Sequence, residues 1–179
     1  MGGRLIYVMG PSGAGKDSVL RAARQAAPPE MWFAHRYITR PADDASENHV
    51  ALSPAEFAAR RDAGGFALHW QSHGWSYGIG IEIDAWMAAG SDVVVNGSRA
   101  AFDAAHRRYP ALLPVLVTAA PEILRARLAA RGRESAEALE ARLHRNAGLA
   151  VRHPGLVTIA NDGTLEDAAH RFLYLTLLR

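Results

Sequence analysis

The sequence contains no cysteine and only one lysine. Without cysteine, the chain has no disulfide, no thiolate nucleophile and no metal site built on cysteine. Lys16 is the single lysine among 20 basic residues, and all the others are arginines. The formal net charge is only +2. This balance argues against the polybasic surface typical of proteins that bind nucleic acid or membrane surfaces.

Long apolar runs are also missing from the sequence. No run reaches the length of a membrane span, and the apolar stretch from Leu5 to Met9 is too short for a signal-peptide core. We therefore expect a cytoplasmic protein without a membrane or nucleic-acid partner, whose oligomeric state the sequence leaves open. The 179 residues, 49% apolar and 21% charged, fit one globular domain with a substantial core.

Short apolar segments alternate along the chain with segments of helical character. Strands are predicted at 4–9, 31–36, 66–72, 92–96, 113–118 and 156–160. Helices are predicted at 16–27, 53–64, 81–89, 100–108, 121–131, 135–151 and 164–178. The alternation predicts an α/β fold, with a mostly parallel sheet flanked by helices. Residues 36–80 interrupt the pattern as an insertion of mixed structure.

Two local patterns in this insertion make specific predictions. Residues 37–48 are polar, contain Pro41, and predict a loop. Ser53, Pro54 and Glu56 together form a strong helix start, because Ser53 can cap the helix and Glu56 completes a capping box.

The segment after the first predicted strand has the spacing of a phosphate-binding loop. Glycines let backbone N–H groups turn around an anion, the following helix adds its positive end, and Lys16 can reach the β and γ phosphates. The alternative is a glycine-rich turn with a surface lysine. We predict that ATP is bound by the loop and the start of its helix: Gly10, Pro11, Ser12, Gly13, Ala14, Gly15, Lys16, Asp17 and Ser18.

Asp17 departs from the usual pattern, because a Ser or Thr that binds magnesium normally follows the lysine. Asp17 either complements the helix dipole or holds Mg²⁺, which carboxylates suit. Asn96 ends the Val93–Val95 strand, where phosphate-loop enzymes often carry an aspartate that orients the metal. Our hypothesis is that the metal-orienting carboxylate has moved from the strand end to the loop.

The sequence resembles the guanylate kinase family along nearly its whole length. The resemblance is carried by the loop at 10–16, by Thr39-Arg40-Pro41 and by the Gly-x-x-Tyr-Gly turn at 74–78. It is also carried by the Arg-x-x-x-Arg-Gly segment at 127–132 and by Asn161-Asp162. The resemblance implies a phosphate-loop kinase in one domain, with a core (1–35 and 81–179), an acceptor-binding insertion (about 36–80) and a lid (about 127–142).

The departures from guanylate kinases concern the acceptor. Those enzymes read guanine with a glutamate and with a Ser or Thr, at positions that correspond to Leu68 and Ile79 here. A site without donors and acceptors for a base cannot discriminate that base. A phosphate-binding tyrosine of the family corresponds to His49, and a small serine corresponds to Arg36. The acceptor site has therefore lost its base-reading groups and gained positive charge.

At these divergent places the chain is similar to the ribose 1,5-bisphosphate phosphokinases. The similar segments are Gly-Lys-Asp-Ser at 15–18, Ile-Thr-Arg-Pro at 38–41, the segment 73–79, and Asn-Gly-Ser-Arg at 96–99. The resemblance implies transfer of the γ-phosphoryl group of ATP to the 1-phosphate of ribose 1,5-bisphosphate, within phosphonate breakdown. The product is 5-phosphoribosyl 1-diphosphate.

Such a reaction needs no general base, because the attacking phosphate oxygen is already ionised. Catalysis then consists of aligning two polyanions and neutralising charge. We predict Lys16, Arg40 and Arg131 as catalytic residues and Asp17 as the Mg²⁺ ligand. Arg127, Arg133 and Arg142 are further lid candidates, though in a chain so rich in arginine about half of these are expected to be bystanders. The predicted acceptor ligands are Arg36, Arg40, Tyr77 and Arg99.

Three other functions compete with this one. A guanylate or other nucleoside monophosphate kinase is disfavoured by Leu68 and Ile79. A non-catalytic guanylate-kinase-like binding module typically loses the loop glycines or lysine, which this chain keeps. A sugar kinase with a hydroxyl acceptor needs a carboxylate base, for which Asp43, Asp44 and Glu47 are candidates.

Overall fold

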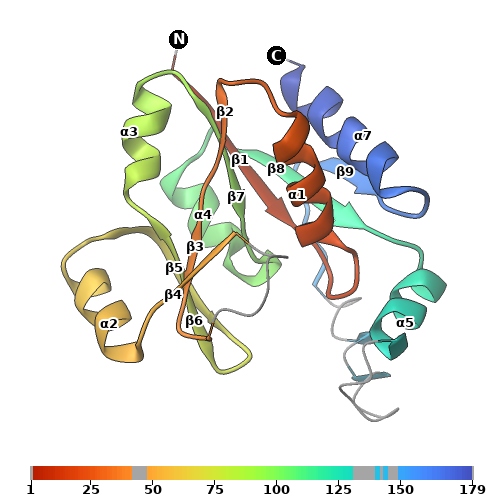
Figure 1. Ribbon diagram of the computed structural model, residues 1–179, viewed down its shortest axis with the longest axis horizontal. Helices are drawn as coiled ribbons and strands as arrows, with labels where there is room; N and C mark the ends of the chain where they lie inside the picture. Colours follow the sequence, from red (N-terminus) through yellow and green to blue (C-terminus); the bar gives the residue numbers. More distant parts are fainter. Residues whose placement is uncertain (1, 42–47, 131–139, 142, 145–148, 179) are drawn as a thin grey trace.

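The computed structural model describes residues 2–41, 48–130, 140–141, 143–144 and 149–178. Its centre is a five-stranded sheet in which every pair of neighbouring strands is parallel, in the order β2-β7-β1-β8-β9 (Figure 1). The strands are β1 (Leu5–Met9), β2 (Met31–Phe33), β7 (Asp92–Asn96), β8 (Leu113–Thr118) and β9 (Val157–Ala160). The predicted α/β fold class is confirmed.

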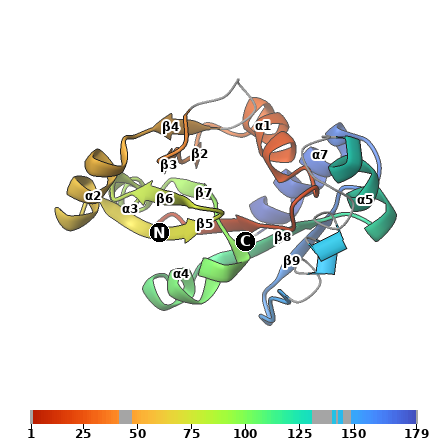
Figure 2. The same ribbon diagram turned by 90° about the horizontal axis from the view of Figure 1, so that it is seen from below.

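The alternating side chains of β1 divide the core into two layers. Ile6 and Val8 point to the face covered by α1 (Lys16–Ala26) and α7 (Leu165–Leu177), which lie side by side. Tyr7 and its neighbours Leu5 and Met9 point to the other face, with α3 (Glu82–Ala88) and α4 (Phe102–Arg108). Figure 2 shows α1 and α7 on one side of the sheet and α4 on the other. Helices on both faces account for the run of buried valines in β7.

Residues 36–80 build a second, four-stranded sheet in the order β4-β3-β6-β5. Its strands are β3 (Arg36–Ile38), β4 (His49–Ala51), β5 (Phe66–Ser72) and β6 (Trp75–Gly80). β5 and β6 form a hairpin whose turn residues, His73 and Gly74, both have positive φ. Helix α2 (Pro54–Asp62) packs beside this sheet through the rings of Phe57 and Phe66, 4.6 Å apart.

Two predictions about this region were wrong. The strand predicted at 31–36 is two strands, because the chain leaves the parallel sheet after Phe33 and joins the second sheet at Arg36. The loop predicted at 37–48 begins inside β3, where Tyr37 and Ile38 pair with β6. The amide of Asn48 donates hydrogen bonds to the carbonyl oxygens of Phe33 and Ala34, which fixes the backbone at the crossing. Residues 42–47 lie outside the described part of the chain.

Most helices match their predicted ranges within one or two residues. The helix predicted at 100–108 is preceded by a 3₁₀ turn, η1 (Arg99–Ala101), and α5 covers Pro121–Ala130. The helix predicted at 135–151 falls mostly outside the described residues; 140–141 and 143–144 are helical, whereas 149–151 are not. Among the described residues, no helix is both long and apolar enough to cross a membrane.

Candidate functional site

The glycine-rich loop joins the end of β1 to the start of α1, and its glycines are required there. Gly13 and Gly15 have φ of +88° and +77°, a region that side chains other than glycine disfavour. At Gly10 a Cβ atom would lie 2.3 Å from the carbonyl oxygen of Val117. The loop is therefore held against β8 with its backbone turned tightly, as an anion cradle requires.

Two residues from distant segments anchor the loop from behind. The amide of Asn161, buried at the end of β9, donates a 2.8 Å hydrogen bond to the carbonyl oxygen of Ala14. Arg127 of α5 donates to the carbonyl oxygen of Asn161 at 3.0 Å and to that of Ala14 at 3.5 Å. Arg127, predicted as a lid residue, thus contacts the loop backbone.

The side chains of Lys16, Asp17 and Asn96 form one network of polar contacts beside the loop. Asn96, at the carboxyl end of β7, accepts a hydrogen bond from Lys16 through Oδ1 and donates to Asp17 Oδ1 through Nδ2 at 2.5 Å. Lys16 Nζ also lies 3.5 Å from Asp17 Oδ1. Arg36 Nη2 approaches the same carboxylate oxygen at 3.5 Å. The loop carboxylate is thus next to the strand-end residue, as our hypothesis for the metal requires.

These contacts decide the charge of Asp17. Partial withdrawal from water favours the neutral acid, but this is outweighed by Lys16, Arg36 and the amide of Asn96. Together they lower the pKa of Asp17 from 3.8 to about 2. The side chain keeps 43% of its surface exposed, so an ionised carboxylate is presented to the cleft at neutral pH.

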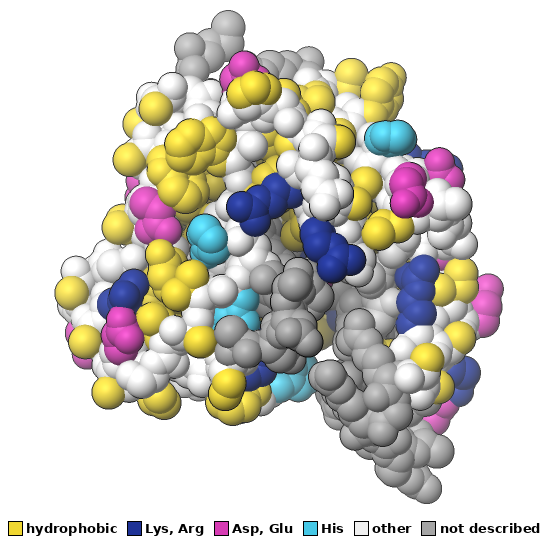
Figure 3. Space-filling view, in the orientation of Figure 1, with side chains coloured by type: hydrophobic (Ala, Val, Ile, Leu, Met, Phe, Trp, Pro, Cys, Tyr) yellow, Lys and Arg dark blue, Asp and Glu magenta, His cyan; other side chains and the backbone are white. Residues whose placement is uncertain are grey.

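A cleft of about 410 Å³ lies between the phosphate-binding loop and the second sheet. In the orientation of Figure 1, the face drawn in Figure 3 carries Lys and Arg side chains near its centre and at its edges, whereas Asp and Glu lie toward the edges. The described residues lining the cleft are Gly10, Pro11, Ser12, Gly13, Gly15, Lys16, Asp17, Ser18, Arg36, Trp70, Ser72, His73, Tyr77, Gly97, Ser98, Arg99, Ala100 and Leu149. Predicted donor and acceptor ligands therefore face one cleft.

At the end formed by the second sheet, Arg36 and Tyr77 come from paired strands. The Arg36 guanidinium carbon lies 5.6 Å from the centroid of the Tyr77 ring, a cation–π distance. The ring of Trp70 also stacks on the ring of Tyr77, with centroids 5.5 Å apart and planes 3° from parallel. Leu68 and Ile79 are opposite each other in the hairpin, 7% and 0% exposed. Both positions are packed into the core.

The segment after β7 forms the third wall of the cleft. Gly97 lies directly over the ring of Tyr7, where a Cβ atom would come within 2.2 Å. The Tyr7 hydroxyl donates to the carbonyl oxygen of Ser98 at 2.9 Å and accepts from its amide at 3.0 Å. Burial raises the pKa of Tyr7 to about 12, against the opposing effect of the Ser98 hydrogen bond, so the hydroxyl keeps its proton. Arg99 is thereby held at the cleft, where it donates to the Leu149 carbonyl oxygen at 3.1 Å.

Some of the predicted site residues lie elsewhere. Arg40, half-buried just after β3, is not among the described residues that line the cleft. Arg131, Arg133 and Arg142 lie outside the described residues, as do most of the predicted lid, Asp43, Asp44 and Glu47, so these roles remain predictions. His49 pairs with Arg36 across β4 and β3 but does not line the cleft.

Trp70, Ser72 and His73 were not among the predicted site residues. All three line the cleft. The available signal was the period-two alternation in β5, because Leu68, Trp70 and Ser72 share a face with Tyr77 across the hairpin. Asn161 was noted only as a family match, and its anchoring of the loop could not be inferred without the contact between β9 and Ala14.

The residues present fit a magnesium ion bound largely by phosphates. No group of three or more His, Asp or Glu side chains suited to a metal occurs within the described residues. Magnesium in kinases is commonly held by one or two carboxylates together with substrate phosphates and water. The ionised, half-exposed carboxylate of Asp17 beside the phosphate loop meets that requirement.

Comparison with known proteins reveals relatives of this chain. A ribose 1,5-bisphosphate phosphokinase PhnN of Desulfomicrobium baculatum is 56% identical over 176 residues, or 97% of this chain and 94% of the relative. A protein of the same name from Burkholderia mallei is 58% identical over 167 residues, or 92% and 90% of the two chains. No protein-family model matches the sequence.

Solved structures agree on the fold. Guanylate kinase from Anaplasma phagocytophilum superposes with a TM-score of 0.70 at 14% identity, covering 97% of this chain and 84% of that one. A gluconokinase from Sinorhizobium meliloti superposes with a TM-score of 0.52 at 20% identity, covering 97% and 90%. At these identities the likeness indicates a shared phosphate-loop kinase fold. Together with relatives that are more than half identical over nearly the whole sequence, it places the chain in the ribose 1,5-bisphosphate phosphokinase family.

Proposed function

We propose that this protein transfers the γ-phosphoryl group of ATP to the 1-phosphate of ribose 1,5-bisphosphate in the cytoplasm, as a step of phosphonate breakdown. The names of its relatives supply the substrate. The observation that carries the proposal is the single cleft that faces Lys16 and the loop on one side and Arg36 and Tyr77 on the other. A donor and an acceptor phosphate can meet there.

The chemistry asks the protein for alignment and for charge. An oxygen of the 1-phosphate attacks the γ-phosphorus, the bond from this phosphorus to the β–γ bridging oxygen breaks, and ADP leaves. The acceptor oxygen is already ionised, so no side chain has to remove a proton. Lys16 and the loop amides hold the donor phosphates, while Arg36 offers a planar fork to the acceptor phosphate. Tyr77 positions that fork through the contact with its ring.

We further propose that Asp17 holds the magnesium ion that accompanies ATP. The ion would neutralise charge on the β and γ phosphates when bound. Asn96 keeps the carboxylate in place by donating to Oδ1, and Lys16 and Arg36 keep it ionised.

Asp17→Asn tests this metal role, because it removes the anionic ligand and keeps the size of the side chain. We expect the concentration of Mg²⁺ needed for half-maximal activity to rise about ten-fold or more, in line with the loss of one ligand carboxylate. Titration of Mg²⁺ at saturating ATP measures this. An unchanged Mg²⁺ dependence would mean that Asp17 only complements the dipole of α1.

A coupled assay for 5-phosphoribosyl 1-diphosphate tests the proposed reaction itself. The purified protein is given ATP and Mg²⁺ with ribose 1,5-bisphosphate, GMP or AMP as the acceptor. We expect turnover with ribose 1,5-bisphosphate and little with the nucleotides. Turnover with GMP alone would indicate a guanylate kinase. ATP binding without transfer to any acceptor would indicate a binding module.

A further inference from the structure

The acceptor end of the cleft has few groups that can read a base. Its polar side chains are those of Arg36, Ser72, His73 and Tyr77, and the only carboxylate among the described lining residues is Asp17 at the phosphate loop. Arginine and hydroxyl groups suit phosphate and sugar oxygens. The two positions at which guanylate kinases read guanine are the apolar Leu68 and Ile79 here, so the matched donor and acceptor for a base edge are missing from them. A planar base could still bind here by stacking, since stacking on an aromatic ring needs no matched edge.

Two side chains, Trp70 and Arg36, already lie against the ring of Tyr77, on which a base could stack. Trp70 is directly opposite Tyr77 in the β5–β6 hairpin, and their rings are parallel within 3° at a centroid distance of 5.5 Å. The guanidinium of Arg36 takes up further space at 5.6 Å from the Tyr77 centroid. Stacking a base on Tyr77 would require one of these groups to move.

Buried side chains limit where the indole of Trp70 can lie. It packs against the buried cluster that contains Leu68 and Ile79, the neighbouring pair of the same hairpin face. These two side chains are 7% and 0% exposed, so the indole lies against the buried core on that side. The hairpin register therefore places the stacked rings of Trp70 and Tyr77 at the acceptor end of the cleft.

We propose that Trp70 determines acceptor specificity by covering Tyr77 and excluding acceptors that carry a nucleobase, which leaves the site to a phosphorylated sugar. This inference rests on the proposed function for the identity of the preferred acceptor. The exclusion of a nucleobase by Trp70 concerns only the geometry of the hairpin, so it can be measured without knowing the preferred acceptor.

The test is a series of side-chain sizes at position 70: Trp70→Phe, Trp70→Leu and Trp70→Ala. The matched control is Trp75→Ala, which removes an indole from the same hairpin but not from the described lining of the cleft. The dissociation constant for GMP is measured by calorimetry for each folded variant, and kcat/KM is measured with ribose 1,5-bisphosphate and with GMP.

We expect Trp70→Ala and Trp70→Leu to bind GMP at least about ten-fold more tightly than the unaltered protein, the range of one base-stacking contact. Trp70→Phe keeps a ring and should stay close to the unaltered protein, as should Trp75→Ala. GMP affinities within two-fold of the unaltered protein in both Trp70→Ala and Trp70→Leu would overturn the proposal. If Trp70→Ala does not fold, Trp70→Leu decides alone, because leucine keeps apolar contact with Leu68 and Ile79.

The two proposals fail in different ways. If the unaltered protein does not use ribose 1,5-bisphosphate, the proposed function fails, while the GMP affinities of the variants still test the role of Trp70. If it uses ribose 1,5-bisphosphate and no variant gains affinity for GMP, the proposed function stands and the role of Trp70 is refuted.

Discussion

At the scale of single residues, the informative basic residue is the lone lysine. The chain uses arginine wherever a cation is needed except at Lys16, which lies in the phosphate-binding loop within reach of Asn96 and Asp17. A lysine ammonium is compact and its stem is flexible, whereas a guanidinium is planar and larger. A compact cation therefore suits the position between the loop and Asn96.

We expect Lys16→Arg, which conserves charge, to lower kcat by roughly 100-fold or more, because the larger planar guanidinium does not fit where the compact ammonium meets the phosphates. The melting temperature should change little, since the side chain contributes no core packing. Arg21→Lys is the matched control, an exchange of the same two residue types at an exposed position of α1. Substantial activity in Lys16→Arg would show that the loop accommodates a planar cation.

The lowered pKa of Asp17 makes a prediction about stability. Its folded pKa of about 2 lies below the ordinary 3.8, so its contribution to folding is complete above 3.8 and is lost as the pH falls toward 2. We expect the difference in free energy of unfolding between the unaltered protein and Asp17→Asn to be constant near neutral pH and to shrink from about pH 5 to about pH 3. Urea denaturation across this range measures it. A difference that stays constant down to pH 3 would contradict the stabilising contacts with Lys16 and Arg36.

Several of the residues predicted for the site lie around one cleft. The predicted loop residues other than Ala14 line it, as do Arg36, Tyr77 and Arg99, whereas Arg40 is not among the described lining residues. Trp70 was not predicted as a site residue because an aromatic residue in a strand can face the core or the substrate, and only the partner strand shows which ring it stacks on.

At the scale of elements, α2 shows how far local signals reach. The Ser53 hydroxyl accepts from the amide of Glu56 at 3.1 Å, which confirms the predicted cap. The break between β2 and β3 carried no such signal. The break depends on the pairing of Arg36 with His49 of β4 and with Ile79 of β6, strands that come later in the sequence. Tertiary pairing of this kind overrides a continuous run of strand-forming residues.

We expect Ser53→Ala to lower the free energy of unfolding by about 1 kcal/mol, because an amide at the start of α2 loses its acceptor. Ser53→Asp should restore most of this loss, since an aspartate can also cap. Chemical denaturation measures both variants. The kcat with ribose 1,5-bisphosphate should change little, because α2 contacts the second sheet through Phe57 and Phe66, which do not line the cleft.

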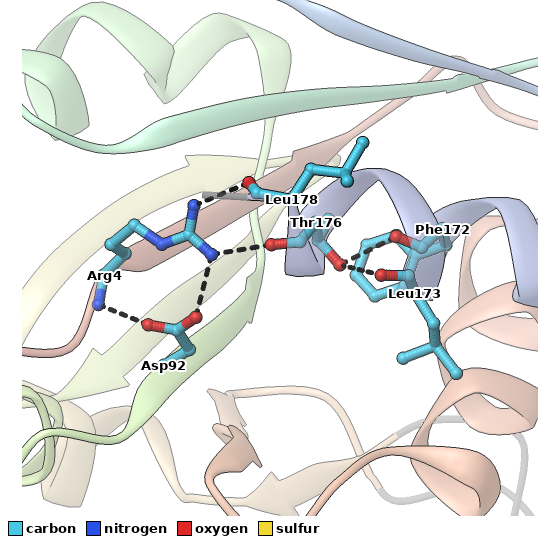
Figure 4. A network of polar contacts seen from close by, with 6 residues as sticks. All are labelled: Arg4, Asp92, Phe172, Leu173, Thr176 and Leu178. Carbon is cyan, nitrogen blue, oxygen red and sulfur yellow. Dashed lines mark hydrogen bonds and ion pairs between the residues drawn. The ribbon is translucent and has the colours of Figure 1, made fainter.

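At the scale of the whole molecule, the site and the chain ends occupy opposite edges of the parallel sheet. Loops at the carboxyl ends of β1 and β7 form the cleft, as expected for an open α/β sheet. At the other edge, Arg4 precedes β1 and Asp92 begins β7. Arg4 binds both Asp92 and the end of α7 there (Figure 4). Stability and catalysis can therefore be altered separately.

Arg4 joins the two ends of the described chain. Its guanidinium donates to Asp92 Oδ2 at 2.9 Å and to the carbonyl oxygen of Thr176 at 2.7 Å, and its backbone amide donates to Asp92 Oδ1 at 2.8 Å. Asp92 is only 5% exposed, so the Arg4 guanidinium supplies part of the compensation for its buried carboxylate. Breaking such a pair from one side leaves a buried charge uncompensated.

We expect Arg4→Ala to lower the free energy of unfolding by about 3 kcal/mol, and the double variant Arg4→Ala with Asp92→Asn to lose less, because a neutral amide then replaces the buried carboxylate. Chemical denaturation of the two single variants and the double variant measures the coupling between the residues. Since the network lies at the edge opposite the cleft, kcat/KM of each folded variant should stay within about two-fold of the unaltered protein. A double variant no more stable than Arg4→Ala would show that the loss comes from the α7 carbonyl contact, and that the buried charge of Asp92 contributes little.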